Sequence, residues 1–479
     1  MPIRFFDTLT KKKEVFSPVV DKTARMYTCG PTVYNFAHIG NFRTYLFEDL
    51  LRRWLKYRGY KVQQVMNLTD VEDKIIRDCQ KEKISLKKFT EPYSKAFFED
   101  LDTLKIERAE VYPKATEHIP EMVAMIQVLL DKGFAYKADD GIYYTISKFK
   151  NYGKLAHIKV KELKAGASGR VLADEYDKEN LGDFALWKFW DDKDGDVFWE
   201  AEIGKGRPGW HIECSAMSAK HLTEAFKNSK FHPEKFVTLD IHTGGVDNIF
   251  PHHQDEIAQT EACVGKKFVN HWLHSEHLLV DNKKMSKSLG NFYTLRDLLA
   301  KGYNPLAIRY ALLSVHYRQK LNFTFKVLEA ATAALQRLND FVHNLDEAHG
   351  EKNNPSISIL IKDAQGKFEA ALDDDLDISP ALAAIFDFVS EINKISIHAL
   401  SKSDAKTVLQ FMEKVDSVLG VLYEEEKLPK DLQKLFDERE KARVSKNWAR
   451  SDELRDELLK KGIAVEDTPH GTRWKRILS

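Results

Sequence analysis

Apolar runs that alternate with amphipathic stretches dominate the first three hundred residues of the chain. Short runs that indicate strands lie at residues 25–28, 60–66, 237–241 and 277–280. Residues 43–56 carry apolar side chains at helical spacing and predict a helix between the first two strands. Strands and helices in alternation predict an α/β domain with a doubly wound parallel sheet.

The pattern changes between residues 112 and 204, which we interpret as an insertion. Within it, residues 134–144 predict a β-hairpin with an Asp-Asp-Gly turn. Alternating strand and helix signals resume at Trp210. We therefore expect the α/β domain in two halves, residues 1–111 and 205–300.

The chain becomes helical after about residue 301. Five segments carry apolar residues at helical spacing: 306–314, 326–345, 357–372, 380–399 and 406–422. Such a series predicts a helix bundle within residues 301–427. Residues 428–479, behind Leu428-Pro429, form a compact charged unit that is expected to end in a turn-rich piece over residues 466–472.

Bulk composition narrows the class of protein. A chain of 479 residues has room for about three domains. Lys and Arg total 73, as do Asp and Glu, so no global cationic field announces a nucleic-acid partner, although a local basic face would suffice. No apolar run approaches the roughly 20 residues of a membrane helix, and the N-terminus is not a secretory signal. Together with only four cysteines, this favours a reducing cytoplasm.

Two short motifs, far apart in the chain, indicate one ATP site. The first is His38-Ile39-Gly40-Asn41, at the turn from a strand to a helix, where a helix N-terminus and an imidazole favour phosphate. The second is Lys284-Met285-Ser286-Lys287-Ser288, which places two lysines on a loop as a cationic clamp. Taken singly, either motif could be ordinary α/β architecture or solvated surface.

Side chains suited to a metal ion lie near the predicted strands: Cys29, Cys214, His252 and Glu256. The two cysteines come from opposite halves of the domain, and His252 and Glu256 are four apart on an expected helix, so they share a face. Two thiolates, an imidazole and a carboxylate make a tetrahedral zinc set. His253 and His242 remain alternatives, and a buried cysteine is often a small core residue.

The two motifs, in this order, resemble the HIGH and KMSKS motifs of class I aminoacyl-tRNA synthetases. Further segments are similar to the cysteinyl-tRNA synthetase family: 28–34, 67–70, 209–215, 250–253, Tyr317-Arg318 and Leu321-Asn322. This likeness covers nearly the whole chain. It implies a class I Rossmann-like catalytic domain split by a connective insertion at 112–204, a stem-contact region and helix bundle over 301–427, and an anticodon-binding domain over 428–479.

The resemblance implies a ligase that activates cysteine with ATP and transfers it to the 3′ end of tRNA(Cys), releasing AMP and pyrophosphate. It implies Mg²⁺ with ATP, a monomeric enzyme, and one zinc ion held by Cys29, Cys214, His252 and Glu256. A pocket that reads shape alone separates near-isosteres by roughly 10–200-fold. Zinc binds a thiolate directly, which serine cannot imitate at neutral pH, so the metal would read the substrate.

Residue roles around the nucleotide follow from the same resemblance. His38, Gly40 and Asn41 contact ATP, with Asp247 as a candidate for the adenylate. Lys287 stabilises charge on the triphosphate, and Lys284 shapes the loop. Because Asn41 stands where the motif has its last histidine and cannot carry a proton, the electrostatic burden is expected to move toward His38 and Lys287.

Two more groups of residues are assigned in this way. Thr69 is expected to contact the amino acid and Trp210 to wall its pocket, although core packing is the alternative for Trp210. The resemblance matches four C-terminal positions to anticodon binding: Arg443, Trp448, Asp452 and Asp467. Arg443 and Trp448 are expected on one helix, where spacing alone favours an amphipathic helix with Trp448 in its core.

Two other functions compete with cysteine–tRNA ligation. One is a paralogous ligase that joins activated cysteine to a small amine, which would not need the C-terminal unit. The other is a catalytically inactive RNA-binding relative, which would be expected to lose the metal quartet or the lysine loop. Both of those features are intact in this sequence.

Overall fold

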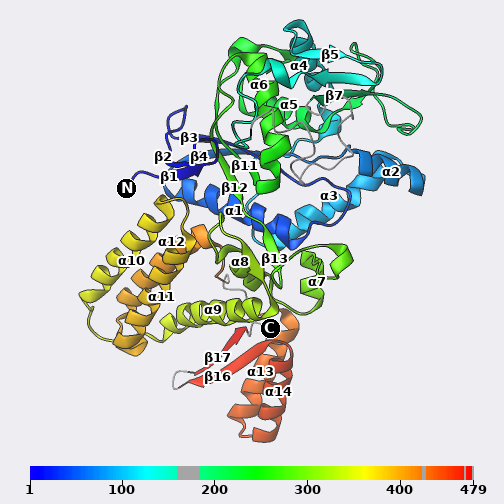
Figure 1. Cartoon of the computed structure of the whole chain (residues 1–479). Coiled ribbons are helices and arrows are strands. Elements are labelled where there is room, and N and C mark those ends of the chain that lie inside the picture. The colour runs from blue at the N-terminus through cyan, green and yellow to red at the C-terminus, as the bar shows by residue number, and fades with distance from the viewer. Residues whose placement is uncertain (159–182, 423–427, 469–470, 477–479) are drawn as a thin grey trace. The chain divides into compact units, whose positions relative to one another are not determined.

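The computed structural model describes residues 1–158, 183–422, 428–468 and 471–476 (Figure 1). It divides into two compact units. The first unit comprises Met1–Leu278, Tyr317–Leu321 and Asp373–Leu376, and the second comprises Leu279–His316, Asn322–Leu372 and Asp377–Ser479.

A parallel sheet with the strand order β12-β11-β3-β4 forms the centre of the first unit. Its strands are β3 (Thr23–Thr28), β4 (Lys61–Met66), β11 (Leu239–Gly245) and β12 (Val269–Ser275). Three helices pack around it: α1 (Ile39–Tyr57), α5 (Trp210–Leu222) and α6 (Gln254–Val264).

Helices cover both faces of this sheet (Figure 1). Neighbouring residues of a strand point to opposite faces. On β11, the Thr243 hydroxyl donates to Glu48 of α1 at 2.7 Å, whereas the His242 ring lies 3.0 Å from Glu256 of α6. The predicted α/β class with a doubly wound parallel sheet is therefore confirmed.

One predicted strand belongs to a different sheet. Residues 277–280 were expected in the central sheet, but β13 (Leu278–Val280) lies in a small separate sheet with β14 (Lys283–Lys284) and β15 (Leu321–Phe323). The edge position next to β11 is instead occupied by β12, a strand that the apolar pattern did not predict. Its buried His271 and His274 stand where a buried parallel strand would usually carry branched apolar residues.

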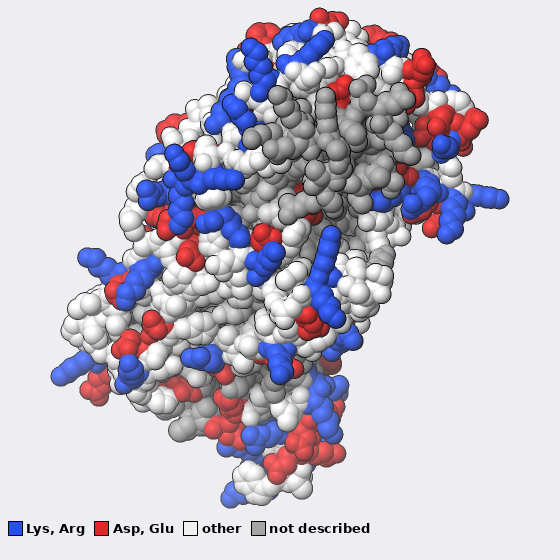
Figure 2. Space-filling model, viewed as in Figure 1, with Lys and Arg blue, Asp and Glu red and all other residues white. Residues whose placement is uncertain are grey.

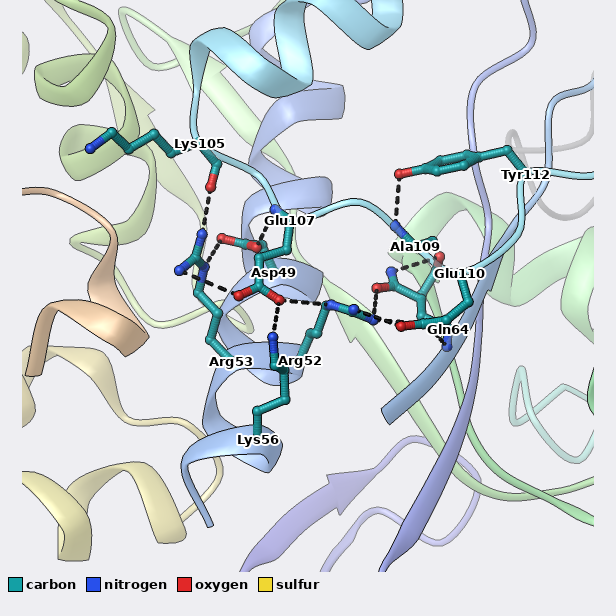
Figure 3. Close-up of polar contacts among 11 residues, drawn as sticks. Asp49, Arg52, Arg53, Lys56, Gln64, Lys105, Glu107, Ala109, Glu110 and Tyr112 are labelled. Carbon is teal, nitrogen blue, oxygen red and sulfur yellow. Dashed lines mark hydrogen bonds and ion pairs between the residues drawn. The ribbon is translucent and has the colours of Figure 1, made fainter. Parts of the chain in front are cut away.

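An ion-pair network fixes the C-terminal half of α1 to the segment that leads into the insertion. Figure 3 shows Arg52 between two carboxylates, with Nη2 2.7 Å from Glu110 Oε1 and Nε 2.9 Å from Glu107 Oε2. Glu110 also accepts from the backbone N–H of Gln64 in β4 at 2.6 Å. The network ties helix, strand and connecting segment together, and it holds the helix whose N-terminus carries the first motif.

The insertion contains a helix and three strands of an antiparallel sheet in the order β5-β6-β7-β8, whose fourth strand, β8, lies just past the expected end of the insertion at residue 204. These elements are α4 (Ile119–Asp131), β5 (Ala135–Lys137), β6 (Gly141–Tyr144), β7 (Phe184–Phe189) and β8 (Gly206–Pro208). The predicted hairpin over 134–144 is confirmed by β5 and β6. The remaining elements of the first unit are β1 (Arg4–Asp7), β2 (Lys12–Val15), α2 (Asp73–Glu82), α3 (Leu86–Thr103), β9 (Phe226–Lys227) and β10 (Lys230–Phe231).

Two short segments from late in the sequence complete the first unit. Buried Asp375 accepts from the Tyr317 hydroxyl at 2.6 Å and from the backbone N–H of Phe6 in β1 at 2.8 Å, both through Oδ1. Its Oδ2 accepts from Nε of Arg318 at 2.7 Å. One carboxylate thus joins the N-terminal strand to both late segments.

The second unit contains the expected series of helices. They are α7 (Leu295–Ala300), α8 (Pro305–Leu313), α9 (Phe325–Asn344), α10 (Ser356–Asp373), α11 (Ile378–Ile395) and α12 (Lys402–Leu419). Two helices end earlier than predicted because the next residue has a positive φ: Ser396 at 69° and Gly420 at 64°. Buried Arg309 of α8 donates from Nε to the carbonyl of Leu419 at 2.7 Å and so satisfies the end of α12.

The C-terminal part has two helices and a hairpin. The helices are α13 (Lys430–Val444) and α14 (Trp448–Lys460), and the strands are β16 (Ile463–Thr468) and β17 (Gly471–Arg476). The prediction that Arg443 and Trp448 share a helix is wrong, because the chain turns at Lys446, which has φ 59°, and Asn447 caps α14. The predicted turn-rich piece over 466–472 is instead the end of the β16–β17 hairpin, with residues 469–470 outside the described residues.

On the face drawn in Figure 2, acidic and basic side chains are interspersed, in keeping with 73 residues of each sign. No helix among the described residues is long and apolar enough to cross a membrane.

Candidate active site and metal centre

The first motif forms the N-terminus of α1. His38 is the N-cap: its Nδ1 accepts from the backbone N–H of Asn41 at 3.2 Å, and Asn41 Oδ1 accepts from the backbone N–H of His38 at 3.1 Å. This reciprocal pair is a capping box. Asn41 therefore has a structural role at this helix end. Because Nδ1 of His38 accepts a hydrogen bond, the proton of the neutral ring lies on Nε2.

His38 is neutral at physiological pH. Burial lowers its pKa to about 4, although the Asp247 carboxylate acts in the opposite direction. With this pKa, the neutral ring contributes to the site through a hydrogen bond. The first turn of α1 holds no acidic residue, so the helix N-terminus keeps its preference for an anion. Asn41 thus contacts His38 directly, and Asp247 lies near enough to His38 to affect its charge.

A buried group of possible metal ligands lies at the carboxyl edge of the same sheet. In the described part of the chain, one group of His, Cys and acidic side chains has all its donor atoms within 4.8 Å of one another: Cys29, His252, His253 and Glu256. His252 Nε2 is 3.1 Å from Glu256 Oε1, and Cys29 Sγ is 3.2 Å from His253 Nε2. Three of the four predicted ligands are in this group, with His253 in place of Cys214.

Cys214 is nevertheless a direct neighbour of the cluster. It is buried on α5 and hydrogen-bonded to both Cys29 and His252. Burial alone would raise the pKa of Cys214, but these hydrogen bonds and the His252 charge lower it well below its usual value. The hydrogen bond with Cys214, followed by burial, raises the pKa of Cys29. The two cysteine side chains thus form one hydrogen-bonded pair at the edge of the cluster.

Further histidines surround the cluster and hold its members. His242 Nε2 lies 3.0 Å from Glu256 Oε2, while Glu256 Oε1 faces His252 Nε2 within the cluster. His211 Nδ1 lies 2.9 Å from His252 Nδ1. His253 uses Nδ1 toward His274 at 2.7 Å, which leaves Nε2 on the cluster side. His242, an alternative ligand from the sequence, thus contacts Glu256 from behind.

The expected amino-acid pocket adjoins the cluster. The Trp210 ring stacks on His252 with centroids 4.4 Å apart at 25°. Thr69 follows β4, and its hydroxyl accepts from Nδ2 of Asn67 at 3.1 Å. A side chain at Gly30 would place Cβ 1.8 Å from the backbone oxygen of Asn67, so only glycine fits at this close approach.

The second motif forms a braced loop in the second unit. Lys284 is exposed at the end of β14, and Lys287 begins a single 3-10 turn, although its side chain lies outside the described residues. Asn291 holds both sides of the loop: its Oδ1 accepts from the backbone N–H of Ser286 at 2.9 Å, and its Nδ2 donates to the carbonyl of Lys284 at 3.2 Å.

The four predicted anticodon residues lie on three elements. Trp448, 58 % exposed, and exposed Asp452 are four apart on α14 and share a face. Trp448 is therefore a surface residue. The core position that the spacing alone had favoured is wrong. Arg443 ends α13, and its Nη1 donates to Asp467 of β16 and to the Thr472 hydroxyl of β17. The structure thus joins Arg443 and Asp467 directly.

Three models of known protein families match successive parts of the chain. Residues 15–333 match the model of the tRNA synthetases class I (C) catalytic domain, residues 367–423 the DALR domain and residues 425–474 the cysteinyl-tRNA ligase anticodon binding domain. The cysteine–tRNA ligase of Protochlamydia amoebophila is 53% identical over 99% of this chain and 98% of its own length. The chain belongs to the cysteinyl-tRNA synthetase family.

Other relatives support the same placement. The cysteine–tRNA ligase of Brachyspira hyodysenteriae is 48% identical over 99% of both chains. A Mycobacterium tuberculosis methionyl-tRNA synthetase in complex with methionyl-adenylate superposes with a TM-score of 0.58 at 15% identity, over 83% of this chain and 88% of its own. The fold is thus that of class I synthetases, with an α/β catalytic domain followed by C-terminal helical and anticodon-binding domains.

Several supporting residues were not predicted from the sequence. Asn291 follows Gly290, which lies two residues after the lysine motif, and Gly-Asn pairs are typical of turns that need such bracing. Arg439, which contacts Asp467, lies four residues before Arg443, a spacing that places both on one face of a helix. His274 carried no signal, because its strand was not predicted.

Proposed function

We propose that this chain activates cysteine with ATP and transfers the cysteinyl group to the 3′ end of tRNA(Cys). The observation that carries the proposal is the placement of the Cys-His-Glu cluster beside Trp210, at the edge of the sheet that also carries the His38 motif. A site that binds the substrate thiolate and a site that binds phosphate, both at one sheet, suit the joining of cysteine to a nucleotide. The family of the chain supports the same reaction.

We assign zinc to the cluster, with Cys29, Cys214, His252 and Glu256 as its ligands. Two thiolates, an imidazole and a carboxylate are donors that zinc prefers. Glu256 Oε1 faces Nε2 of His252, another proposed ligand, at 3.1 Å, which supports a ligand role, while its Oε2 lies 3.0 Å from His242 Nε2. When bound, the zinc ion supplies a direct bond to the thiolate of substrate cysteine. Serine lacks such a thiolate, and selectivity follows from this difference.

The side chains around the nucleotide position it and neutralise its charge. The N-terminus of α1 receives phosphate, and His38, neutral with its proton on Nε2, offers a hydrogen bond there. Asn41 holds the orientation of His38 through the capping box. Lys287 balances charge on the triphosphate, Lys284 shapes the loop, Asp247 contacts the adenylate, and Mg²⁺ accompanies ATP.

Transfer to tRNA uses the C-terminal domain. We assign Arg443, Trp448, Asp452 and Asp467 to the anticodon, with Trp448 as a stacking surface for an unpaired base. The match of residues 425–474 to an anticodon-binding domain favours tRNA over a small amine as the acceptor. We expect the enzyme to act as a monomer in the cytoplasm, where its four free, buried cysteines stay reduced.

Pyrophosphate exchange with cysteine and serine in parallel tests the proposal, with elemental analysis of the purified protein alongside. We expect one zinc per chain, exchange with cysteine and none with serine. Cys214→Ser should raise KM for cysteine far more than KM for ATP, and His253→Asn should leave the zinc content at one. A metal-free enzyme that still selects cysteine would overturn the assignment. If His253→Asn lost its zinc while Cys214→Ser kept one zinc per chain, His253 rather than Cys214 would be the fourth ligand.

A further inference from the structure

The C-terminal part contains a buried arginine that the anticodon assignment does not use. Arg439 lies on α13 four residues before Arg443, and its side chain is 2% exposed. Its Nη1 and Nη2 donate to Oδ1 and Oδ2 of Asp467, each at 2.6 Å, in the two-pronged geometry that fixes a carboxylate plane. Nη1 also lies 3.3 Å from the Thr472 hydroxyl.

The two oxygens of Asp467 have different surroundings. In the described part of the chain, Oδ1 accepts from Arg439, Arg443 and Thr472, whereas Oδ2 accepts from Arg439 alone. An ionised carboxylate offers about four acceptor positions. Oδ2 is therefore the oxygen with capacity for another hydrogen bond. The Asp467 side chain is 29% exposed, so it reaches the surface while Arg439 lies beneath it.

We propose that Arg439 is a positioning residue for anticodon recognition, and that Asp467 accepts through Oδ2 from an N–H on the Watson–Crick edge of an anticodon base. The proposal rests on the assignment of Asp467 to the anticodon made above. Arg439 does not touch the tRNA. It fixes the plane of the Asp467 carboxylate and, through Oδ1, the neighbouring guanidinium of Arg443.

Attachment of the hairpin to the helices does not require this ion pair. Leu458, Ile463 and Val465 already form an apolar cluster between α14 and β16. Apolar residues often replace buried ion pairs without loss of stability. A two-pronged pair instead gives a single orientation of the acceptor, which discrimination between bases requires.

Steady-state aminoacylation of tRNA(Cys) by full-length Arg439→Gln, Asp467→Asn and the double variant tests the proposal. We expect Asp467→Asn to lower kcat/KM for tRNA by about 5- to 150-fold, as for a base-edge contact. Arg439→Gln should cost no more than that, and the double variant should match Asp467→Asn within about twofold. Pyrophosphate exchange should stay unchanged in all three. Arg439→Lys, which keeps the charge but loses one prong, should recover part of the loss.

Discrimination against a tRNA with a substituted anticodon gives the second measurement. It should fall in Arg439→Gln and Asp467→Asn. In the control Arg450→Gln, which removes an arginine of α14 paired with Glu453, any loss should be equal for both tRNAs. A larger loss in Arg439→Gln than in Asp467→Asn, or losses that multiply in the double variant, would make Arg439 merely structural. Full tRNA charging by Arg439→Gln, together with reduced charging by Asp467→Asn, would overturn the role of Arg439 but not the anticodon assignment. An unimpaired Asp467→Asn would overturn the anticodon assignment itself.

Discussion

Replacing His242 by phenylalanine tests its contact with the Cys-His-Glu cluster. The ring stacks on Trp272 with centroids 4.7 Å apart at 20°, and it meets Tyr27 edge-on at 5.0 Å. Phenylalanine keeps a ring in this space but removes Nε2, which lies 3.0 Å from Glu256 Oε2, and Nδ1, which lies 3.3 Å from the carbonyl oxygen of Thr243. A hydrogen bond to a charged acceptor is worth about 1.5–3 kcal/mol, which corresponds to a factor of about 10–150 in a binding constant. Loss of the partner of a metal ligand typically weakens metal affinity about 10–100-fold.

We therefore expect His242→Phe to raise the Kd for zinc about 10–100-fold, measured by chelator competition with the zinc-loaded full-length protein. His271→Phe is the matched control, because His271 is a buried ring on β12 packed on Phe16, and its Nδ1 has no hydrogen-bond partner among the described residues. Thermal unfolding of both chelator-treated variants shows whether they fold alike. An unchanged Kd in His242→Phe, or an equal loss in His271→Phe, would refute the argument.

Three further predictions concern other parts of the molecule. Gly420→Ala should lower the free energy of unfolding by about 1–3 kcal/mol in urea titrations, because φ is 64° and the new Cβ would lie 2.9 Å from Arg309 Nη2. Equal urea midpoints for the variant and the unaltered protein would contradict this prediction. Burial raises the pKa of Glu48 to about 8, so the folded state binds its proton between about pH 4.5 and 8 where the unfolded state releases it. Stability should fall as pH rises through that window, by up to about 1.4 kcal/mol per pH unit, and Glu48→Gln should flatten the fall; identical slopes would exclude Glu48 as the cause. A chain ending at residue 427 should keep pyrophosphate exchange and lose most tRNA charging, since residues 425–474 match the anticodon-binding domain; normal charging would make that domain dispensable.

The central architecture could be predicted from the sequence because its period-two and period-3.6 patterns are strong. β12 could not, because Asn270, His271 and His274 mask its apolar residues, and their burial results from a polar cluster that forms only in the folded chain. The break between α13 and α14 is a similar case. Helical spacing runs on past Arg443, and the stop depends on a positive φ at Lys446, a residue type that rarely adopts it.

The candidate site was predictable as a set of residues but not as a set of contacts. Chemistry and spacing left His253 and His242 as alternatives to His252, and the ligand set was chosen through the family resemblance. The neutrality of His38 could not be inferred, because it follows from burial, which composition does not give. The sequence also could not show that Asn41 replaces a histidine without losing a helix cap, since that depends on the backbone geometry at residues 38–41.

The Asp375 junction has a consequence for how the chain can be shortened. The backbone N–H of Phe6 in the N-terminal strand donates to Asp375, which lies 369 residues later in the chain. Asp375 also follows the lysine loop by nearly ninety positions. A fragment cut near residue 300, where the α/β pattern stops, would leave that amide and its neighbours without partners. The smallest autonomous catalytic piece therefore extends to at least Leu376 and carries α8, α9 and α10 as an internal excursion.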